Sequence, residues 1–236
     1  VLSDKEIAAV TKIDVYDMGI SDLTGIEYFE NLAILECMFN KLTTLDISKN
    51  TALIELNCYH NQLTSLDVSD HTELIKLCFD SNNITSIDLS NNTALTYLSC
   101  SATKLTSIDI SNNTALITLH CAYNQFTSLD VSNNTALAGL YCYDGQLTSL
   151  DISENTALKI LICDHNKLTS LDLSNNTALT ELTCTNNKLT SLDLSNNTAL
   201  TALYCNNNKL TSPNVSNNAS LSFLNCYGNQ LASLDV

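Results

Sequence analysis

Apolar residues recur along this chain with a period of 21 residues, and the same polar residues separate them in each period. The stretch Leu168 to Lys188 shows one full period, and Leu189 begins the next almost letter for letter. The half from Leu179 to Leu189 reads L-x-x-L-x-C-x-x-N-x-L, which predicts a short strand followed by an asparagine turn. In the other half, Leu171 and Leu173 mark a return segment. No single copy can bury its apolar face, so the sequence predicts a solenoid of stacked repeats.

The repeats begin after a short N-terminal segment. A first unit of 22 residues, 10–31, reads V-x-x-I-x-V-x-x-M-x-I, and a last, truncated unit begins at Leu221. Between them lie nine units of 21 residues, which begin at Leu32, Leu53, Leu74, Leu95, Leu116, Leu137, Leu158, Leu179 and Leu200. In residues 1–9, Ser3 and Glu6 have the spacing of a capping box and predict a short helix that covers the first repeat. We therefore expect a partial N-terminal cap at 1–9 and one repeat domain at 10–236.

The strand half of each unit matches the leucine-rich-repeat signature, with cysteine where most such repeats carry a third leucine. The run Ile20 to Leu32, ISDLTGIEYFENL, closely resembles the repeats of the internalins, which are surface proteins of Gram-positive bacteria. The later units, with their inward cysteine, are similar to the cysteine-ladder branch of that family. We expect an α/β repeat solenoid: a right-handed leucine-rich-repeat superhelix with a parallel concave β-sheet and a short helical N-terminal cap. The resemblance also implies a secreted protein or one at the cell-wall surface of a Gram-positive bacterium.

Nine cysteines share one position of the repeat: Cys37, Cys58, Cys100, Cys121, Cys142, Cys163, Cys184, Cys205 and Cys226. Stacked equivalent residues lie ~4.8 Å apart, which is within the Cα range of a disulfide. Buried cysteine also serves as a small apolar residue, and we favour free thiols over disulfides or zinc. Phe79 fills the position in the third full unit, directly after the tenth cysteine, Cys78. Because strand residues alternate, Cys78 is expected to point outward as the one exposed, reactive thiol.

Two polar residues also recur once per repeat. We expect an inward asparagine to satisfy backbone groups of the turn, at Asn40, Asn61, Asn82, Asn124, Asn166, Asn187, Asn208 and Asn229. An aspartate recurs in the return segment, at Asp46, Asp67, Asp88, Asp109, Asp130, Asp151, Asp172, Asp193 and Asp235. We interpret these aspartates as outward, solvated acids, because a calcium site needs several oxygens that converge on one point. We interpret the N-N-T triplets as turn residues rather than glycosylation acceptors, and we expect no metal or cofactor.

The charge of the chain excludes two classes of partner. The formal net charge is −15, and all ten basic residues are lysine. Nucleic acids and anionic membranes are bound through clustered cations, so we expect neither as a partner. No apolar run approaches the ~18 residues that a membrane span needs, and we expect no membrane insertion.

The variable positions of L-x-x-L-x-C-x-x-N are expected to face solvent on the concave sheet. Most of the tyrosines and histidines occupy these positions. The candidate partner-binding residues are Tyr59, Tyr97, His120, Tyr123, Tyr141, Tyr143, Ile162 and His165. Stacking of the repeats predicts one file of His120, Tyr141 and Ile162, and another of Tyr123, Asp144 and His165. Tyrosine combines apolar area with a hydroxyl and suits recognition, although its high strand propensity is an alternative reason for its presence.

These observations predict a non-catalytic module, since no variable position shows an activated nucleophile beside a base or a phosphate-binding glycine loop. The resemblance implies a virulence-associated adhesion module that binds a protein or glycoprotein on a cell surface. Two alternatives are a carbohydrate-binding module, with tyrosines stacked on sugar rings, and a passive spacer. The last repeat carries no cap, so we also expect possible self-association through the C-terminal end.

Overall fold

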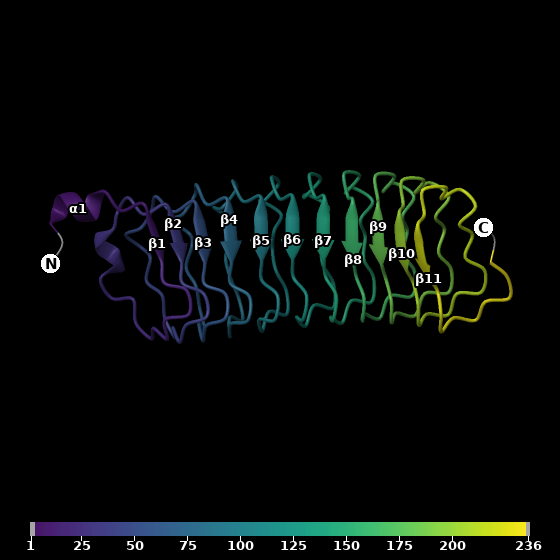
Figure 1. Ribbon diagram of the computed structural model, residues 1–236, viewed down its shortest axis with the longest axis horizontal. Helices are drawn as coiled ribbons and strands as arrows, with labels where there is room; N and C mark the ends of the chain where they lie inside the picture. Colours follow the sequence, from purple (N-terminus) through teal and green to yellow (C-terminus); the bar gives the residue numbers. More distant parts are fainter. Residues whose placement is uncertain (1–2, 235–236) are drawn as a thin grey trace. The chain divides into compact units, whose positions relative to one another are not determined.

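The computed structural model describes residues 3–234. The first two residues of the predicted cap and Asp235 of the aspartate series therefore lie outside the described part. Eleven short strands form in this part of the chain, together with one five-residue α-helix and one three-residue 3-10 turn (Figure 1). The chain divides into two compact units, Val1–Ala115 and Leu116–Val236, which are described separately.

The first unit opens with helix α1 (Asp4–Ala8) and contains the 3-10 turn η1 (Ile26–Tyr28). Its strands are β1 (Lys12–Asp14), β2 (Ile34–Glu36), β3 (Glu55–Asn57), β4 (Lys76–Cys78) and β5 (Tyr97–Ser99). Each strand pairs in parallel with the next in chain order.

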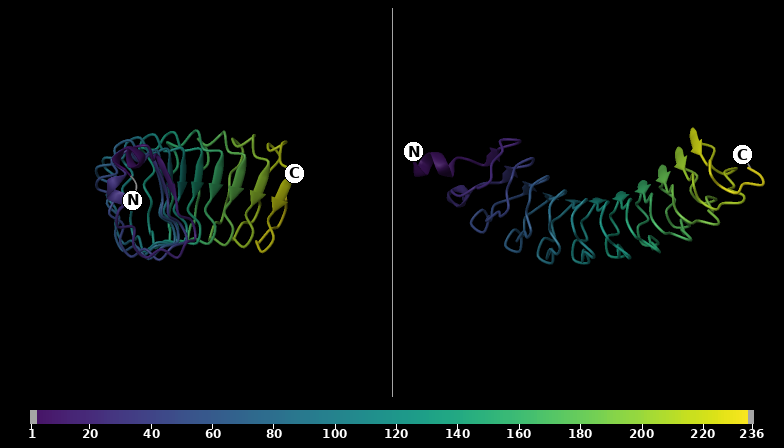
Figure 2. Two further views of the ribbon diagram at one scale, coloured as in Figure 1. Left: turned by 60° about the vertical axis from the view of Figure 1, so that its left-hand side comes forward. Right: turned by 90° about the horizontal axis from the view of Figure 1, so that it is seen from below.

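The second unit contains only strands, turns and irregular segments among its described residues. Its strands are β6 (Thr118–His120), β7 (Gly139–Tyr141), β8 (Ile160–Ile162), β9 (Glu181–Thr183), β10 (Ala202–Tyr204) and β11 (Phe223–Asn225). They also pair in parallel with their sequence neighbours, without a shift in register: Leu140 faces Leu161, and Leu161 faces Leu182. In both units the strands form one side of the coil and the return segments the other (Figure 2).

Each three-residue strand of the repeats points its central residue inward, which is leucine from β2 onward. In β8, Leu161 is fully buried while Ile160 and Ile162 on either side of it are half-buried on the outer face. Leu158, two residues before β8, and Cys163, directly after it, are also fully buried. The core of each unit is thus a stack of identical layers, and it forms only when copies cover one another.

The predicted inward asparagine acts as expected on the turns that carry it, while Thr103 and Gly145 replace it after β5 and β7. In one repeat, Asn187 Nδ2 donates to the carbonyl oxygens of Cys163 at 3.0 Å and Cys184 at 3.2 Å. Its Oδ1 accepts from the amide of Leu168 at 3.0 Å. One side chain thereby ties a repeat to the preceding one and removes the cost of leaving backbone groups unpaired.

A second asparagine series, which the sequence pattern predicts only as turn residues, is buried even more completely. It comprises the second asparagine of each N-N-T triplet and its equivalents: Asn50, Asn92, Asn113, Asn134, Asn155, Asn176, Asn197 and Asn218. Asn176 is fully buried, and its Nδ2 donates to Ile152 O and Asn155 O, each at 3.0 Å. His71 replaces asparagine in one repeat and places Nε2 3.2 Å from Ile47 O. These buried contacts join consecutive repeats on the side opposite the strands.

The fold prediction is confirmed as a leucine-rich-repeat solenoid with parallel strands, but the α/β description overstates the helix. Helix α1 is the one α-helix among the described residues, and it holds the predicted capping box between Ser3 and Glu6. No residue of α1 is buried, so the helix alone does not seal the first repeat. The division into a cap at 1–9 and one repeat domain at 10–236 stays a prediction.

The cysteine ladder is confirmed: the thiols are free, and from Cys37 to Cys205 its members are buried. The prediction that Cys78 is exposed is wrong. Cys78 lies on the outer face of β4, in register between Asn57 and Ser99, yet only 7% of it is exposed. Asp80 raises the pKa of the thiol and Lys76 lowers it, so charged groups of both signs lie near it. Side-chain cover, rather than strand alternation, decides its accessibility.

Thiol labelling is therefore expected to mark Cys226 first in the native chain, not Cys78. Burial, with a smaller effect of Asp80, raises the pKa of Cys78 to about 12, so little thiolate is present at neutral pH. Cys226 is the ladder cysteine that is only half-buried. Alkylation followed by peptide mapping, with and without denaturant, measures the order. Rapid native labelling of Cys78 would contradict the packing of β4.

Candidate binding site

The variable residues on the strands, and on the turns that directly follow them, form an outward surface that we call the sheet face. Each unit carries an aromatic cluster on this face, and a further stacked pair, Tyr204 and Phe223, lies on β10 and β11 with ring centroids 4.6 Å apart. Within the second unit, His120 and Tyr141 stack with their ring centroids 4.1 Å apart and their planes within 5°. Ile162 follows Tyr141 in register, so the predicted file of His120, Tyr141 and Ile162 is present.

A second aromatic pair lies on the segments that directly follow β6 and β7 in the same two repeats. Tyr123 and Tyr143 meet edge to face at 5.2 Å, and 55% of Tyr123 remains exposed. Aromatic pairs in this geometry hold each other in place and leave ring faces for a partner. Together, the residues His120, Tyr123, Tyr141 and Tyr143 form what we call the unit 2 cluster.

The other predicted file, Tyr123, Asp144 and His165, exists but does not lie on the strands. These residues follow the strands by three positions and have left-handed backbones, with φ of 54°, 50° and 52°. The same position is left-handed in the neighbouring repeats as well, at Asn186 and Asn207. The prediction that strand alternation aims these side chains is therefore wrong, because a turn with positive φ directs them.

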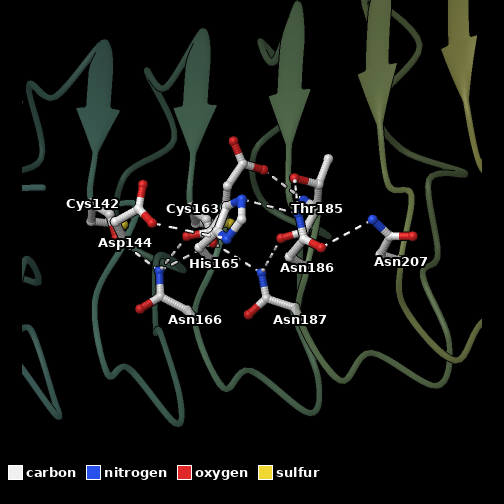
Figure 3. A network of polar contacts seen from close by, with 10 residues as sticks. Cys142, Asp144, Cys163, His165, Asn166, Thr185, Asn186, Asn187 and Asn207 are labelled. Carbon is white, nitrogen blue, oxygen red and sulfur yellow. Dashed lines mark hydrogen bonds and ion pairs between the residues drawn. The ribbon is translucent and has the colours of Figure 1, made fainter. Parts of the chain in front are cut away.

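Polar side chains continue the unit 2 cluster through this left-handed file (Figure 3). His165 Nδ1 lies 3.9 Å from Asp144 Oδ1, and its Nε2 lies 3.0 Å from Asn186 Nδ2. Asn207 Nδ2 in turn donates to Asn186 Oδ1 at 3.0 Å. The file thus presents a carboxylate, an imidazole and two amides in one row, each held by its neighbour.

Negative charge gathers beside the tyrosines of this cluster. The Asp144 carboxylate, more than burial, raises the pKa of the Tyr123 hydroxyl, which stays protonated and able to donate. Burial also raises the pKa of Asp164, although the Thr185 amide donates to it at 2.6 Å. The surface therefore offers a hydrogen-bond donor on aromatic rings next to acidic acceptors.

The remaining predicted residues, Tyr59 and Tyr97, belong to the first unit. Tyr97 lies on β5, with the Lys76 ammonium 5.9 Å from its ring centroid. Tyr59 packs edge to face on Phe39 at 5.0 Å, and Phe39 also contacts Tyr16 at 5.4 Å and His60 at 4.8 Å. These four residues form the unit 1 cluster. Phe39 is absent from the predicted residues, which are mainly tyrosine and histidine, although it occupies the same repeat position as Tyr123 and His165.

The described residues contain no group of three or more histidine, cysteine, aspartate or glutamate side chains that could hold a metal ion. Within residues 3–234, no helix has the length and apolar character to cross a membrane.

Parallel strands in an unbroken register, a buried cysteine in nearly every layer and buried asparagines at the turns define a leucine-rich-repeat solenoid with a cysteine ladder. No family model matches the chain. The solved structure described as the functional domain of InlJ from Listeria monocytogenes, which includes a cysteine ladder, is similar with a TM-score of 0.84 and 38% identity. The match covers 100% of this chain and 57% of that one.

A curated protein gives the same result on a shorter stretch. Over 50 residues, 21% of this chain, the sequence is 43% identical to internalin J of Listeria monocytogenes serotype 4b (strain F2365). An internalin F structure from the same species has a TM-score of 0.65 at 23% identity and supports the fold alone. The chain is thus a leucine-rich-repeat protein that closely resembles internalin J.

The likeness to internalin J also bears on catalysis. Leucine-rich-repeat domains of internalins are non-catalytic, which agrees with the prediction that the chain is not an enzyme. The chain spans 57% of the solved InlJ domain and 6% of the curated internalin J.

Proposed function

We propose that this chain is the binding module of a secreted or cell-wall protein of a Gram-positive bacterium, and that it adheres to a protein or glycoprotein on another cell surface. The observation that carries the proposal is the unit 2 cluster. Four aromatic rings lie on the sheet face within two consecutive repeats, and Tyr123 is more than half exposed. Exposed aromatic groups next to fixed polar ones are typical of interface hot spots.

The similarity to internalin J supports the location and the class of activity. The internalin-like first unit and the cysteine ladder both favour a bacterial surface protein. The net charge of −15 disfavours nucleic acid and anionic lipid as targets, which leaves proteins and glycans. Within the site, the stacked pair and Ile162 would supply apolar contact, while Tyr123, Asp144 and His165 would fix orientation through hydrogen bonds.

The proposal is tested by affinity capture from candidate host-cell surfaces, with the native chain compared with a triple variant, Tyr123→Ala, Tyr141→Thr and Tyr143→Ala. Natural repeats of this chain carry Ala102, Thr183 and Ala122 at the corresponding positions, so the variant is expected to fold. A glycan array run in parallel separates a carbohydrate ligand from a protein ligand. Equal recovery by both chains would remove the unit 2 cluster as the site.

Each single variant, Tyr123→Ala, Tyr141→Ala or Tyr143→Ala, is expected to weaken binding of the captured partner by about 2 kcal/mol, or roughly 30-fold. Truncating a central ring removes contact area and the support it gives to its neighbour. Titration calorimetry measures the loss. Tyr28→Ala is the control, because Tyr28 lies in η1, away from the strands, and is 67% exposed. Its affinity is expected to stay within about twofold of native.

A further inference from the structure

The sheet face of the first unit combines exposed apolar groups with unbalanced acids. The apolar groups are those of the unit 1 cluster, in which Phe39 contacts the rings of Tyr16, Tyr59 and His60. Tyr16 is 52% exposed. Met38, which precedes Phe39 in the sequence, has its thioether 3.7 Å from Asn57 Nδ2 and adds a soft apolar group. An unpaired apolar strip of this kind marks an interaction surface.

Acidic side chains occupy the strand and turn positions next to the cluster. They are Asp14, Asp17, Glu36, Glu55 and Asp80, against two lysines, Lys12 and Lys76, at such positions. Lys76 is already engaged, because its Nζ lies 3.9 Å from Glu55 Oε2. Asp80 is also engaged: its Oδ1 accepts from Ser99 Oγ at 2.6 Å and from the Ser101 amide at 2.8 Å.

Glu36 differs from its acidic neighbours. It lies on β2, half-buried, in register between Asp14 and Asn57. Its Oε2 is shielded from solvent and accepts no hydrogen bond from the described residues. A carboxylate oxygen that has lost water without gaining a donor costs free energy, and rotation of the half-buried Glu36 side chain toward a charged donor on the sheet face would recover it.

We propose that this surface binds a protein segment that presents an arginine side chain, with the guanidinium on Glu36 and adjacent apolar side chains on the unit 1 cluster. The inference rests on the proposed role of the sheet face in binding, but it concerns residues of the first unit alone. Charge complementarity selects the partner: five acids against two lysines attract a basic segment and repel phosphate, nucleic acid and acidic peptides.

Arginine fits this surface better than lysine for two reasons. Its planar guanidinium pairs with a carboxylate through two parallel hydrogen bonds, and it stacks on aromatic faces. It is also more weakly hydrated than an ammonium group and loses less on entering a half-buried site. The chain contains no arginine, so the guanidinium has to come from the partner.

The test is selection from a random 12-residue peptide library displayed on phage, panned against the native chain and against the double variant Glu36→Gln and Phe39→Ala. Repeats of this chain carry Asn57 and Ala102 at the corresponding positions, so the variant keeps groups that the fold already accepts. Peptides recovered by the native chain alone are expected to be enriched about threefold or more in arginine, with apolar residues nearby.

Substitutions in a selected peptide then distinguish the contribution of charge to binding from that of shape. Replacing its arginine by citrulline, the neutral isostere, is expected to weaken binding about tenfold or more, and Glu36→Gln about fivefold or more. Tyr123→Ala, in the second unit, is the matched control and is expected to change the affinity less than twofold. Absence of arginine enrichment, or equal binding of arginine and citrulline peptides, would overturn the inference. Neither result would affect the proposal for the unit 2 cluster, which is tested by its own variants.

Discussion

The variant Asn176→Ala is expected to lower the free energy of unfolding by about 2–3 kcal/mol, while the adjacent Asn175→Ala changes it by less than about 0.5 kcal/mol. Asn176 is fully buried, and its Nδ2 donates to Ile152 O and Asn155 O of the preceding repeat. Asn175 is exposed and donates once, to Ser153 O at 3.1 Å. The two residues have the same side chain and adjacent positions, so the difference isolates the value of burial.

Two further observations bound the size of this effect. The carbonyls of Ile152 and Asn155 keep the hydrogen bonds of their own turn, from the amides of Asn155 at 3.0 Å and Leu158 at 3.1 Å. Oδ1 of Asn176 is buried and accepts no hydrogen bond among the described residues, so its removal recovers part of the cost. The loss is therefore that of two second hydrogen bonds and some packing, rather than of two orphaned carbonyls.

Urea and thermal unfolding, followed by circular dichroism, measure the difference between the two variants. Repeat arrays can unfold in more than one step, so the same transition has to be compared in each variant. Asn176→His is an informative third variant. His71 occupies the equivalent position with Nε2 3.2 Å from one carbonyl, so histidine is expected to retain about half of the stability that alanine loses. Equal stability of Asn175→Ala and Asn176→Ala would contradict the account.

The repeat pattern was sufficient to predict the solenoid, its register and the cysteine ladder. This succeeded because the information is redundant: each layer repeats the same apolar positions, and the structure places Leu161 and Cys163 where the pattern puts them. The same redundancy concealed the second asparagine series. An N-N-T triplet reads equally as a turn and as a buried anchor, and only the geometry of the preceding carbonyls distinguishes Asn175 from Asn176.

The candidate site was predicted only in part, because the sequence pattern shows neither the backbone conformation after each strand nor which side chains are covered. Strand alternation correctly placed His120 and Tyr141 in one file. It failed at Tyr123 and His165, because the strands end after three residues and a left-handed turn follows. It also failed at Cys78, whose outward direction is right but whose thiol is covered. Within a strand, periodicity predicts the direction of a side chain, whereas its exposure depends on the neighbouring side chains that cover it.

The variant Phe79→Cys, which restores the ladder residue, is expected to destabilise the chain by about 2–3 kcal/mol. Phe79 is fully buried and is the largest of the fully buried side chains. Its backbone keeps the regular contacts of the layer, with its amide donating to Ser99 O at 2.9 Å and its carbonyl accepting from Asn82 Nδ2 at 3.0 Å. The ring is accommodated without breaking the stack, so its removal leaves a cavity that fixed neighbouring layers cannot fill.

Phe126→Leu is the matched control for this experiment. Phe126 is 3% exposed and stands where Leu147 stands in the next repeat, so leucine fills most of the same volume. Its cost is expected to stay below about 1.5 kcal/mol. For a chain of this length, a loss of about 2–3 kcal/mol corresponds to a melting temperature about 4–12 °C below that of the native chain, against less than about 6 °C for the control. A higher melting temperature for Phe79→Cys than for the native chain would show that the ring strains its layer, because relief of strain would then outweigh the cavity.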